Sequence, residues 1–190
     1  MGKKKKPIIE FAVGKYRNNI LREMTLKLDC NILIADSDGM SRYSTLNAIM
    51  TALKNQKDNI RVIVVDILKI LDCDFEVIDD ANTALDNLFT FENDGRETFI
   101  IIDNFELLQR ADKRKFQMIV RNSSYTANAN IHLIFATGQC EFDSISWRIK
   151  SYFGAKISYR LNTFVKQMTL MNISDKDYRD IDAEKELFFE

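Results

Sequence analysis

The sequence has little proline, glycine, histidine or cysteine. A single proline, Pro7, and six glycines in 190 residues argue against low-complexity segments and long flexible linkers. The lone histidine, His132, excludes most histidine-based metal sites, and we expect it to be a satisfied core residue on a buried strand. Cys30, Cys73 and Cys140 lie far apart without a CxxC pair, which predicts structural thiols in a reducing compartment.

Long apolar runs are also missing. The longest runs, such as Phe99 to Ile102 and Leu133 to Ala136, have the length of a strand, whereas a helix needs roughly 20 apolar residues to span a bilayer. The start, MGKKKKP, lacks the apolar stretch of a secretory signal, and Lys6 stands where a myristoylation signal has Ser or Thr. We therefore expect that this chain does not itself cross a membrane.

The net charge is close to zero, because the chain has 27 basic and 28 acidic side chains. The formal value of −1 lacks the positive field of a dedicated nucleic-acid binder. The two ends nevertheless differ. Met1 to Leu28 carries eight basic and two acidic residues, a net of +6, and Ser174 to Glu190 carries three basic and seven acidic residues, a net of −4. The run Lys3 to Lys6 either contacts anionic lipid or is a solvated linker.

Apolar residues make up 46% of the chain, which suits one globular core. We expect a basic linker or non-native end over residues 1–7, one domain over 8–172 and an acidic tail over 173–190. The tail ends in Leu187, Phe188 and Phe189, which form either a last strand at the sheet edge or a docking peptide.

Continuous apolar runs alternate with helical patterns along the domain. Residues 8–13 and 24–28 are predicted to form a hairpin. The expected strands then cover 31–35, 61–67, 75–78, 98–104, 132–138 and 155–161, and the expected helices cover 41–55, a segment capped by Asp80, 112–121 and a short segment after Asp143. Solid apolar strands between amphipathic helices predict an α/β fold, with a mainly parallel sheet covered by helices on both faces.

Polar residues follow three of the expected strands. The first strand leads through ADSDGMSRYST into a helix, the third long strand ends at Asp103, and the fourth ends at Thr137. Ligands of parallel sheets bind at the carboxyl ends of the strands. These residues are therefore the candidate functional positions.

Several segments, taken in order, resemble a known family. They are AVGK (12–15), ILIA with the loop and helix that contain 47–49, RVIVVD (61–66), FIIIDNFELL (99–108) and ANIHLIFAT (129–137). Over about Ile8 to Asn162 this order resembles the FtsK/SpoIIIE-type motor ATPases, and it is most similar to the last, degenerate ATPase module of type VII (ESX) secretion ATPases of the EssC/EccC type.

The resemblance implies a RecA-like P-loop fold with an N-terminal β-hairpin. It also implies a module at the cytoplasmic C-terminus of a bacterial cell-membrane protein, whose membrane helices and neighbouring ATPase modules lie outside these residues. In that family the last module is associated with recognition of secreted WXG100-type helical hairpins. The implied partners are therefore such substrates and the neighbouring modules, and no nucleic acid is expected.

The phosphate-binding loop departs from the motif GxxxxGK[ST], which needs glycines, a lysine and a short hydroxyl. The substituted and retained positions are, in order, Asp36 at the first glycine, Gly39 at an internal glycine, Ser41 at the glycine before the lysine, Arg42 at the lysine and Tyr43 at the Ser/Thr position. Asp38 adds a second acid, and each acid near phosphate costs on the order of 4 kcal/mol. Arg42 either holds an anion at the helix N-terminus or forms an internal ion pair with Asp36 or Asp38.

The second ATPase motif is incomplete as well. Asp103 is kept, as a vestigial magnesium contact or as an acid that caps the next helix, but Asn104 stands where these motors carry the glutamate that activates water. After the sensor-like Thr137 the family's Gln-Arg is replaced by Gly138 and Gln139. We therefore expect no catalytic residue, no metal and no bound cofactor, including ATP with magnesium. The alternative is an ATP-binding or ATP-hydrolysing FtsK-like translocase of protein or DNA.

An aromatic cluster is the candidate partner site. Trp147, Tyr152 and Phe153 surround a short helix expected after Asp143. They either pack against the final strand or form part of an apolar groove for a partner helix.

Overall fold

The computed structural model describes residues 10–13, 24–27, 30–36, 39–56, 60–91, 94–125, 130–138, 153–159 and 187–189. Its main sheet contains β3 (Ile32–Ala35), β4 (Ile60–Val65), β5 (Glu76–Ile78), β6 (Glu97–Ile102), β7 (Ile131–Thr137), β8 (Ala155–Tyr159) and β9 (Leu187–Phe189). The strand order is β5-β4-β6-β7-β3-β8-β9. Neighbouring strands are parallel from β5 to β8, and β9 pairs antiparallel with β8.

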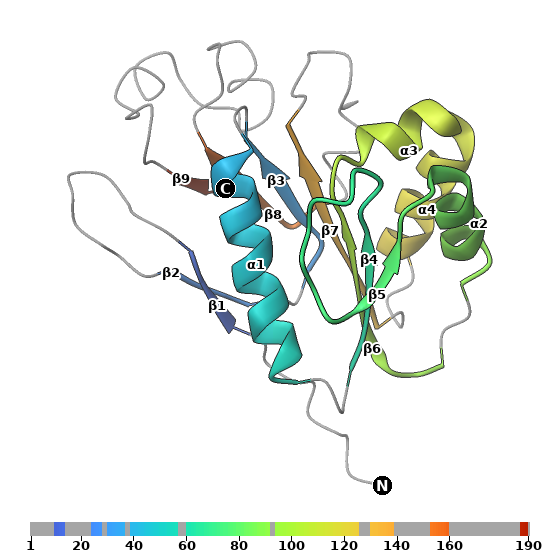
Figure 1. Ribbon diagram of the computed structural model, residues 1–190. Helices are drawn as coiled ribbons and strands as arrows, with labels where there is room; N and C mark the ends of the chain where they lie inside the picture. The colour runs from blue at the N-terminus through green and yellow to red at the C-terminus, as the bar shows by residue number, and fades with distance from the viewer. Residues whose placement is uncertain are drawn as a thin grey trace, which may run out of the picture.

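Helices cover both faces of this sheet, as the sequence predicts. Helix α1 (Met40–Lys54) lies on one face, and α2 (Ala81–Phe89), α3 (Glu106–Ala111) and α4 (Lys113–Tyr125) lie on the other (Figure 1). Strands β1 (Glu10–Val13) and β2 (Met24–Lys27) form the predicted antiparallel hairpin, and β1 lies against α1. The fold is therefore the predicted α/β fold with an N-terminal hairpin.

The core consists of two clusters, one on each face of the sheet. Leu46, Ile49 and Leu53 of α1 cover one face, and each is fully buried. Phe116 of α4 and Leu85 of α2 pack on the other face. Alternate residues of strands β4, β6 and β7 belong to the two clusters, because successive side chains point to opposite faces of the sheet. This explains why the sequences of these strands are apolar at nearly every position.

Some predicted elements end differently in the structure. Helix α3 is not predicted by the sequence, and Asp66 follows β4 instead of lying within it. The acidic tail contributes β9, so the strand alternative holds for residues 187–189. The short helix expected after Asp143 falls outside the described residues. No helix in the described part of the chain is both long and apolar enough to cross a bilayer.

His132 is a core residue, as predicted. It is 6% exposed, its Nε2 lies 2.5 Å from Glu97 Oε1, and its ring stacks on Phe99 with 4.8 Å between centroids. Cys30 and Cys73 are thiols and not disulfide partners. Cys140 lies outside the described residues.

Candidate functional site at the carboxyl edge of the sheet

Four adjacent strands end at buried polar residues. Asp36 follows β3, Asp66 follows β4, Asp103 follows β6, and Thr137 is the last residue of β7. Each is at most 2% exposed. Because these strands are parallel neighbours, their carboxyl ends meet at one edge of the sheet. The structure thus brings together the strand ends that the sequence singles out and adds Asp66 to them.

Arg42 lies at the centre of this edge. It belongs to the first turn of α1, which begins after Gly39 in a left-handed conformation (φ +87°). Arg42 is only 4% exposed, and its Nε lies 3.1 Å from Asp103 Oδ1. Neither atom makes an aligned hydrogen bond, so the pair is held by charge. Arg42 thus forms an internal ion pair, but its partner is Asp103 and not the predicted Asp36 or Asp38. Asp36 accepts the backbone N–H of Arg42 instead, and Asp38 lies outside the described residues.

Asp36 occupies the N-terminal end of α1. Its Oδ2 accepts a hydrogen bond from the backbone N–H of Arg42 at 2.9 Å, and its own N–H donates to Thr137 O at 3.1 Å. Free N–H groups in the first turn of a helix are the donors that phosphate uses in P-loop proteins. Here a carboxylate of the chain itself takes one of these donors.

Two neighbours fix the guanidinium of Arg42. Its Nη2 donates to the Tyr43 hydroxyl at 2.8 Å, and its Cζ lies 4.8 Å from the centroid of the Tyr43 ring. On another side, a Cβ at Gly138 would lie 2.5 Å from Nη1, closer than side-chain atoms approach. Glycine at position 138 is therefore what leaves room for the buried arginine.

The turn after β6 holds Asp103 in place. Asn104 has a left-handed backbone (φ +50°), which asparagine tolerates, and its Nδ2 donates to Asp103 Oδ2 at 2.8 Å. Phe105 is fully buried and stacks on Phe116 and Phe135. Helix α3 begins after Phe105 without a side-chain cap, so the interpretation of Asp103 as a helix cap is wrong.

Sequence reasoning missed two acids at this edge. Asp66 Oδ2 accepts from Leu71 N–H at 2.6 Å, and the Glu106 carboxyl hydrogen-bonds the Thr137 side chain. Asp66 ends a buried strand in the same way as Asp103, and this repeated pattern could have revealed it. Glu106 gave no such signal, because α3 was not predicted.

The edge has more buried acids than buried bases. Asp36, Asp66, Asp103 and Glu106 are each at most 3% exposed, and Arg42 is the one buried lysine or arginine in the described part of the chain. Burial raises the pKa of Asp103 to about 6. Arg42 opposes this shift, while Asp66 and Glu106 add to it. Burial also raises the pKa of Glu106.

This arrangement fits a triphosphate with magnesium poorly. A phosphate would face an excess of carboxylates, and the N–H of Arg42 already has an acceptor. Asp103, the expected metal contact, faces a guanidinium. Within the described residues, no group of three or more His, Cys, Asp or Glu is arranged to hold a metal ion.

The remaining predicted residues lie around this edge or outside the described structure. Ser41 O accepts from Thr45 Oγ1 at 2.9 Å within α1. Phe153 is 7% exposed and packs on Phe135, with 5.1 Å between ring centroids. Asp38, Trp147 and Tyr152 lie outside the described residues.

No protein-family model and no curated protein matches the sequence. Several solved structures, however, are similar to the structure of this chain. The conjugation coupling protein TcpA of pCW3, determined with ATPγS, is 15% identical with a TM-score of 0.76, over 97% of this chain and 63% of TcpA. The cytoplasmic domain of the type VII secretion ATPase EccC from Thermomonospora curvata is 12% identical with a TM-score of 0.72, over 100% of this chain and 28% of EccC.

EssC ATPases 2 and 3 from Geobacillus thermodenitrificans are 14% identical with a TM-score of 0.62, over 95% of this chain and 42% of that one. The chain thus spans less than two thirds of each of these proteins. At such low identity the comparisons bear on the fold. The chain therefore has the fold shared by type VII secretion ATPase domains and the coupling protein TcpA, as its sequence resemblance predicts.

Proposed function

We propose that this chain is a catalytically inactive ATPase-fold module of a type VII secretion motor. It acts in recognition of WXG100-type secreted proteins or in regulation of neighbouring ATPase modules. The observation that carries this proposal is the buried pair of Arg42 and Asp103, which uses the family's lysine and magnesium-linked aspartate positions to neutralise each other.

Electrostatics supports inactivity. A like-charge pair at about 4 Å costs on the order of 4 kcal/mol at an effective dielectric near 20. Asp36 beside the helix N-terminus and the excess of buried carboxylates oppose phosphate, and Arg42 has a single charge with which to offset them. Tyr43 does not supply the short hydroxyl that holds magnesium in P-loop enzymes.

A binding or regulatory role fits a fold that has lost its nucleotide chemistry. A related structure, EccC ATPases 2 and 3, was determined in complex with a signal sequence peptide, and it is 14% identical with a TM-score of 0.62, over 81% of this chain and 34% of that one. By analogy, the proposed setting is a longer bacterial protein, with its membrane helices and other ATPase modules outside these residues. The module itself would lie on the cytoplasmic side.

Nucleotide calorimetry tests inactivity. Millimolar ATP with magnesium is expected to give neither a binding heat nor turnover, and no rise in melting temperature. A dissociation constant below about 100 μM would overturn this part of the proposal. The matched control is the double substitution Asp36→Gly with Arg42→Lys, which removes one acid and restores the lysine. A gain of ATP binding in that variant would identify these two residues as the cause of inactivity.

Recognition is tested with a labelled C-terminal peptide of a WXG100 protein. A scrambled peptide and duplex DNA at the same salt concentration are the controls. Retention of the native peptide alone supports the proposal. Salt-sensitive DNA binding without peptide retention would favour a DNA-tracking domain instead.

One observation favours the rival function, ATP hydrolysis by an FtsK-like translocase. Glu106 places a buried carboxyl with a raised pKa beside Thr137, so a general base is not missing from this edge. If the chain turns over ATP and Glu106→Gln lowers the rate by about 100-fold or more, the rival is correct.

A further inference from the structure

The connection between β4 and β5 lacks a helix. Parallel strands are usually joined by a helix that covers the sheet, but residues 66–75 form an irregular connection. Asp66 stabilises a turn at the start of this connection. The Asp66 carboxylate accepts a hydrogen bond from Leu71 N–H, and the Asp66 carbonyl accepts one from Lys69 N–H at 3.2 Å. Leu71, Cys73 and Phe75 then pack partly buried against the core beneath α1. This connection covers the sheet less completely than a helix would.

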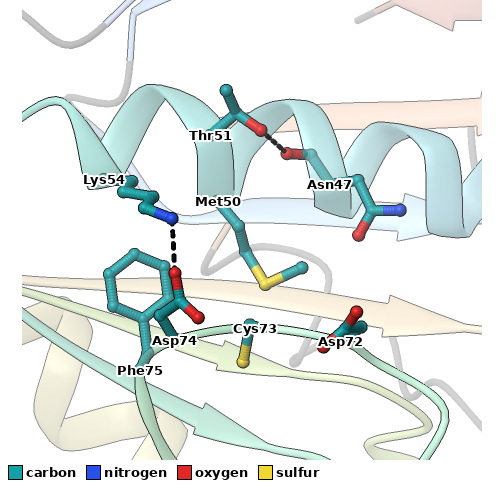
Figure 2. Close-up of a pocket in the computed structure, with 8 residues that line it drawn as sticks. All are labelled: Asn47, Met50, Thr51, Lys54, Asp72, Cys73, Asp74 and Phe75. Carbon is teal, nitrogen blue, oxygen red and sulfur yellow. Dashed lines mark hydrogen bonds and ion pairs between the residues drawn. The ribbon is translucent and has the colours of Figure 1, made fainter.

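A cavity of about 390 Å³ remains between α1 and this connection. Its walls are Asn47, Met50, Thr51 and Lys54 from one face of α1, and Asp72, Cys73, Asp74 and Phe75 from the connection (Figure 2). Met50 points from α1 towards the connection in the middle of the view. The cavity is thus apolar at its centre and polar at both ends.

The two ends differ in charge. At one end Lys54 Nζ pairs with Asp74 Oδ2, so these two charges cancel. At the other end Asp72 lies beside Asn47, and its exposed carboxylate has no ion-pair or hydrogen-bond partner among the described residues. Among the residues that the structure describes, the cavity therefore has one uncompensated negative charge next to the apolar side chains in its middle.

We propose that this cavity receives a lysine or arginine side chain of a partner protein. The methylene groups of that side chain lie over Met50 and Cys73 in the middle of the cavity, and its cationic head pairs with Asp72. The inference rests on the proposed function, because it takes the occupant to be part of a protein recognised by this module. It places that recognition at the second half of α1, away from the carboxyl edge of the sheet.

The shape and charge of the cavity select this occupant. Long basic side chains bury their apolar stems while the charged head stays near water, which matches an apolar centre with an acid at the rim. An acidic side chain would meet Asp72 and Asp74. A purely apolar side chain would leave the Asp72 carboxylate partly desolvated without a partner.

Disulfide trapping tests the charge preference directly. Asn47→Cys places a thiol opposite Asp72, and this position and the three native cysteines fall in four different tryptic peptides. Mass spectrometry therefore reads each thiol separately. Cystamine also has the better leaving thiol, so the labelling by each reagent is divided by its labelling of free glutathione. On this normalised scale and at equal concentration, cystamine is expected to modify the introduced thiol about five-fold more than bis(2-hydroxyethyl) disulfide does.

Asp72→Asn in the same background is expected to abolish this preference. Asp94→Asn is the matched control, because it removes one exposed carboxylate that pairs with Arg96 on the loop before β6. The preference should survive it. Equal labelling by the two reagents, or equal effects of the two asparagine variants, would overturn the proposal.

Charge reversal at Asp72 tests whether the cation that enters the cavity belongs to a partner protein. Asp72→Lys should weaken binding of the labelled WXG100 protein about ten-fold, while Asp94→Lys leaves it unchanged. Unchanged binding in both variants, or protection of the introduced thiol by spermidine at concentrations where a lysine-containing peptide has no effect, would overturn the protein assignment. If the wild-type chain binds no WXG100 protein but still prefers cystamine, the proposed function fails and the cation site remains.

Discussion

The charged side chains at the two ends of α1 lie in opposite environments, buried at the first turn and exposed in the second half. At its first turn Arg42 is buried, and its neighbours Asp36 and Asp103 bind its backbone N–H and its guanidinium. In its second half Lys54 is exposed, its partner Asp74 is exposed, and Asp72 is left over beside a cavity. One helix therefore borders a closed corner in which the buried arginine is already paired, and an open corner with an exposed acid.

This difference shows where ligand binding is physically favourable. A buried charge that already has its counter-charge gains little from a new ligand, because the ligand must first displace the partner. An exposed carboxylate above an apolar floor loses nothing by accepting a cation. The corner around Arg42 therefore gains less free energy from a charged ligand than the corner beside Asp72 does.

Removal of Arg42 has the largest expected effect. Arg42→Met leaves Asp103 buried without its cation and should lower the free energy of unfolding by about 3–5 kcal/mol at pH 7.5, measured by urea denaturation. Adding Asp103→Leu should recover at least half of this loss. The exposed Arg114→Met is the control and should stay within about 0.5 kcal/mol. A loss below about 1 kcal/mol in Arg42→Met would show that the pair does not hold the corner closed.

A methyl group at position 138 tests how tightly the same corner is packed. Gly138→Ala brings a Cβ to 2.5 Å from Arg42 Nη1, and displacing that guanidinium should cost about 1–3 kcal/mol. In the Arg42→Met background the same substitution should cost much less, because the clashing atoms are absent. Equal costs in both backgrounds would mean that Arg42 moves freely, which contradicts a closed corner.

The pH dependence of stability follows from the raised pKa of Asp103. Because about 6 exceeds the ordinary value of 3.8, the folded state binds this proton more tightly than the unfolded chain. The resulting stabilisation is complete below pH 3.8 and is lost as the pH rises through about 6. Relative to Asp103→Asn, the wild type should therefore gain on the order of 1 kcal/mol between pH 7.5 and pH 5 in parallel urea titrations. A difference that is flat with pH would place Asp103 in a solvated site.

The open end should be the least sensitive to substitution. Asp72→Asn is expected to change the free energy of unfolding by less than about 0.5 kcal/mol, because the carboxylate is exposed and unpaired among the described residues. Asp36→Asn, which alters a buried acceptor of the Arg42 N–H, serves as the comparison and should cost more. Equal effects would remove the contrast between the two ends of α1.

The sequence predicts best those elements whose signals are local. Strands β4, β6 and β7 were recognisable because burial on both faces demands apolar residues at successive positions, whichever strands are their neighbours. The cap of α2 was equally local, since the Asp80 side chain accepts from Thr83 N–H at 2.7 Å within one turn.

Features set by distant parts of the chain could not be predicted. Asp103 is remote in sequence from Arg42, and it becomes the partner because β6 and the start of α1 meet at one edge of the sheet. Helix α3 has six residues, too few for a clear periodicity, so Glu106 was missed with it. The cavity beside α1 arises from a helix that the β4–β5 connection lacks, and its lining comes from segments separated in sequence.

The antiparallel strand β9 affects how the protein behaves when it is shortened. Its three residues pair with Ile157, Ser158 and Tyr159 and thereby cover the outer edge of β8. Unpaired strand edges are templates for addition of strands from other molecules. A chain cut before residue 187 would leave Ile157, Ser158 and Tyr159 of β8 without these partners, and we expect it to aggregate more readily than the full chain.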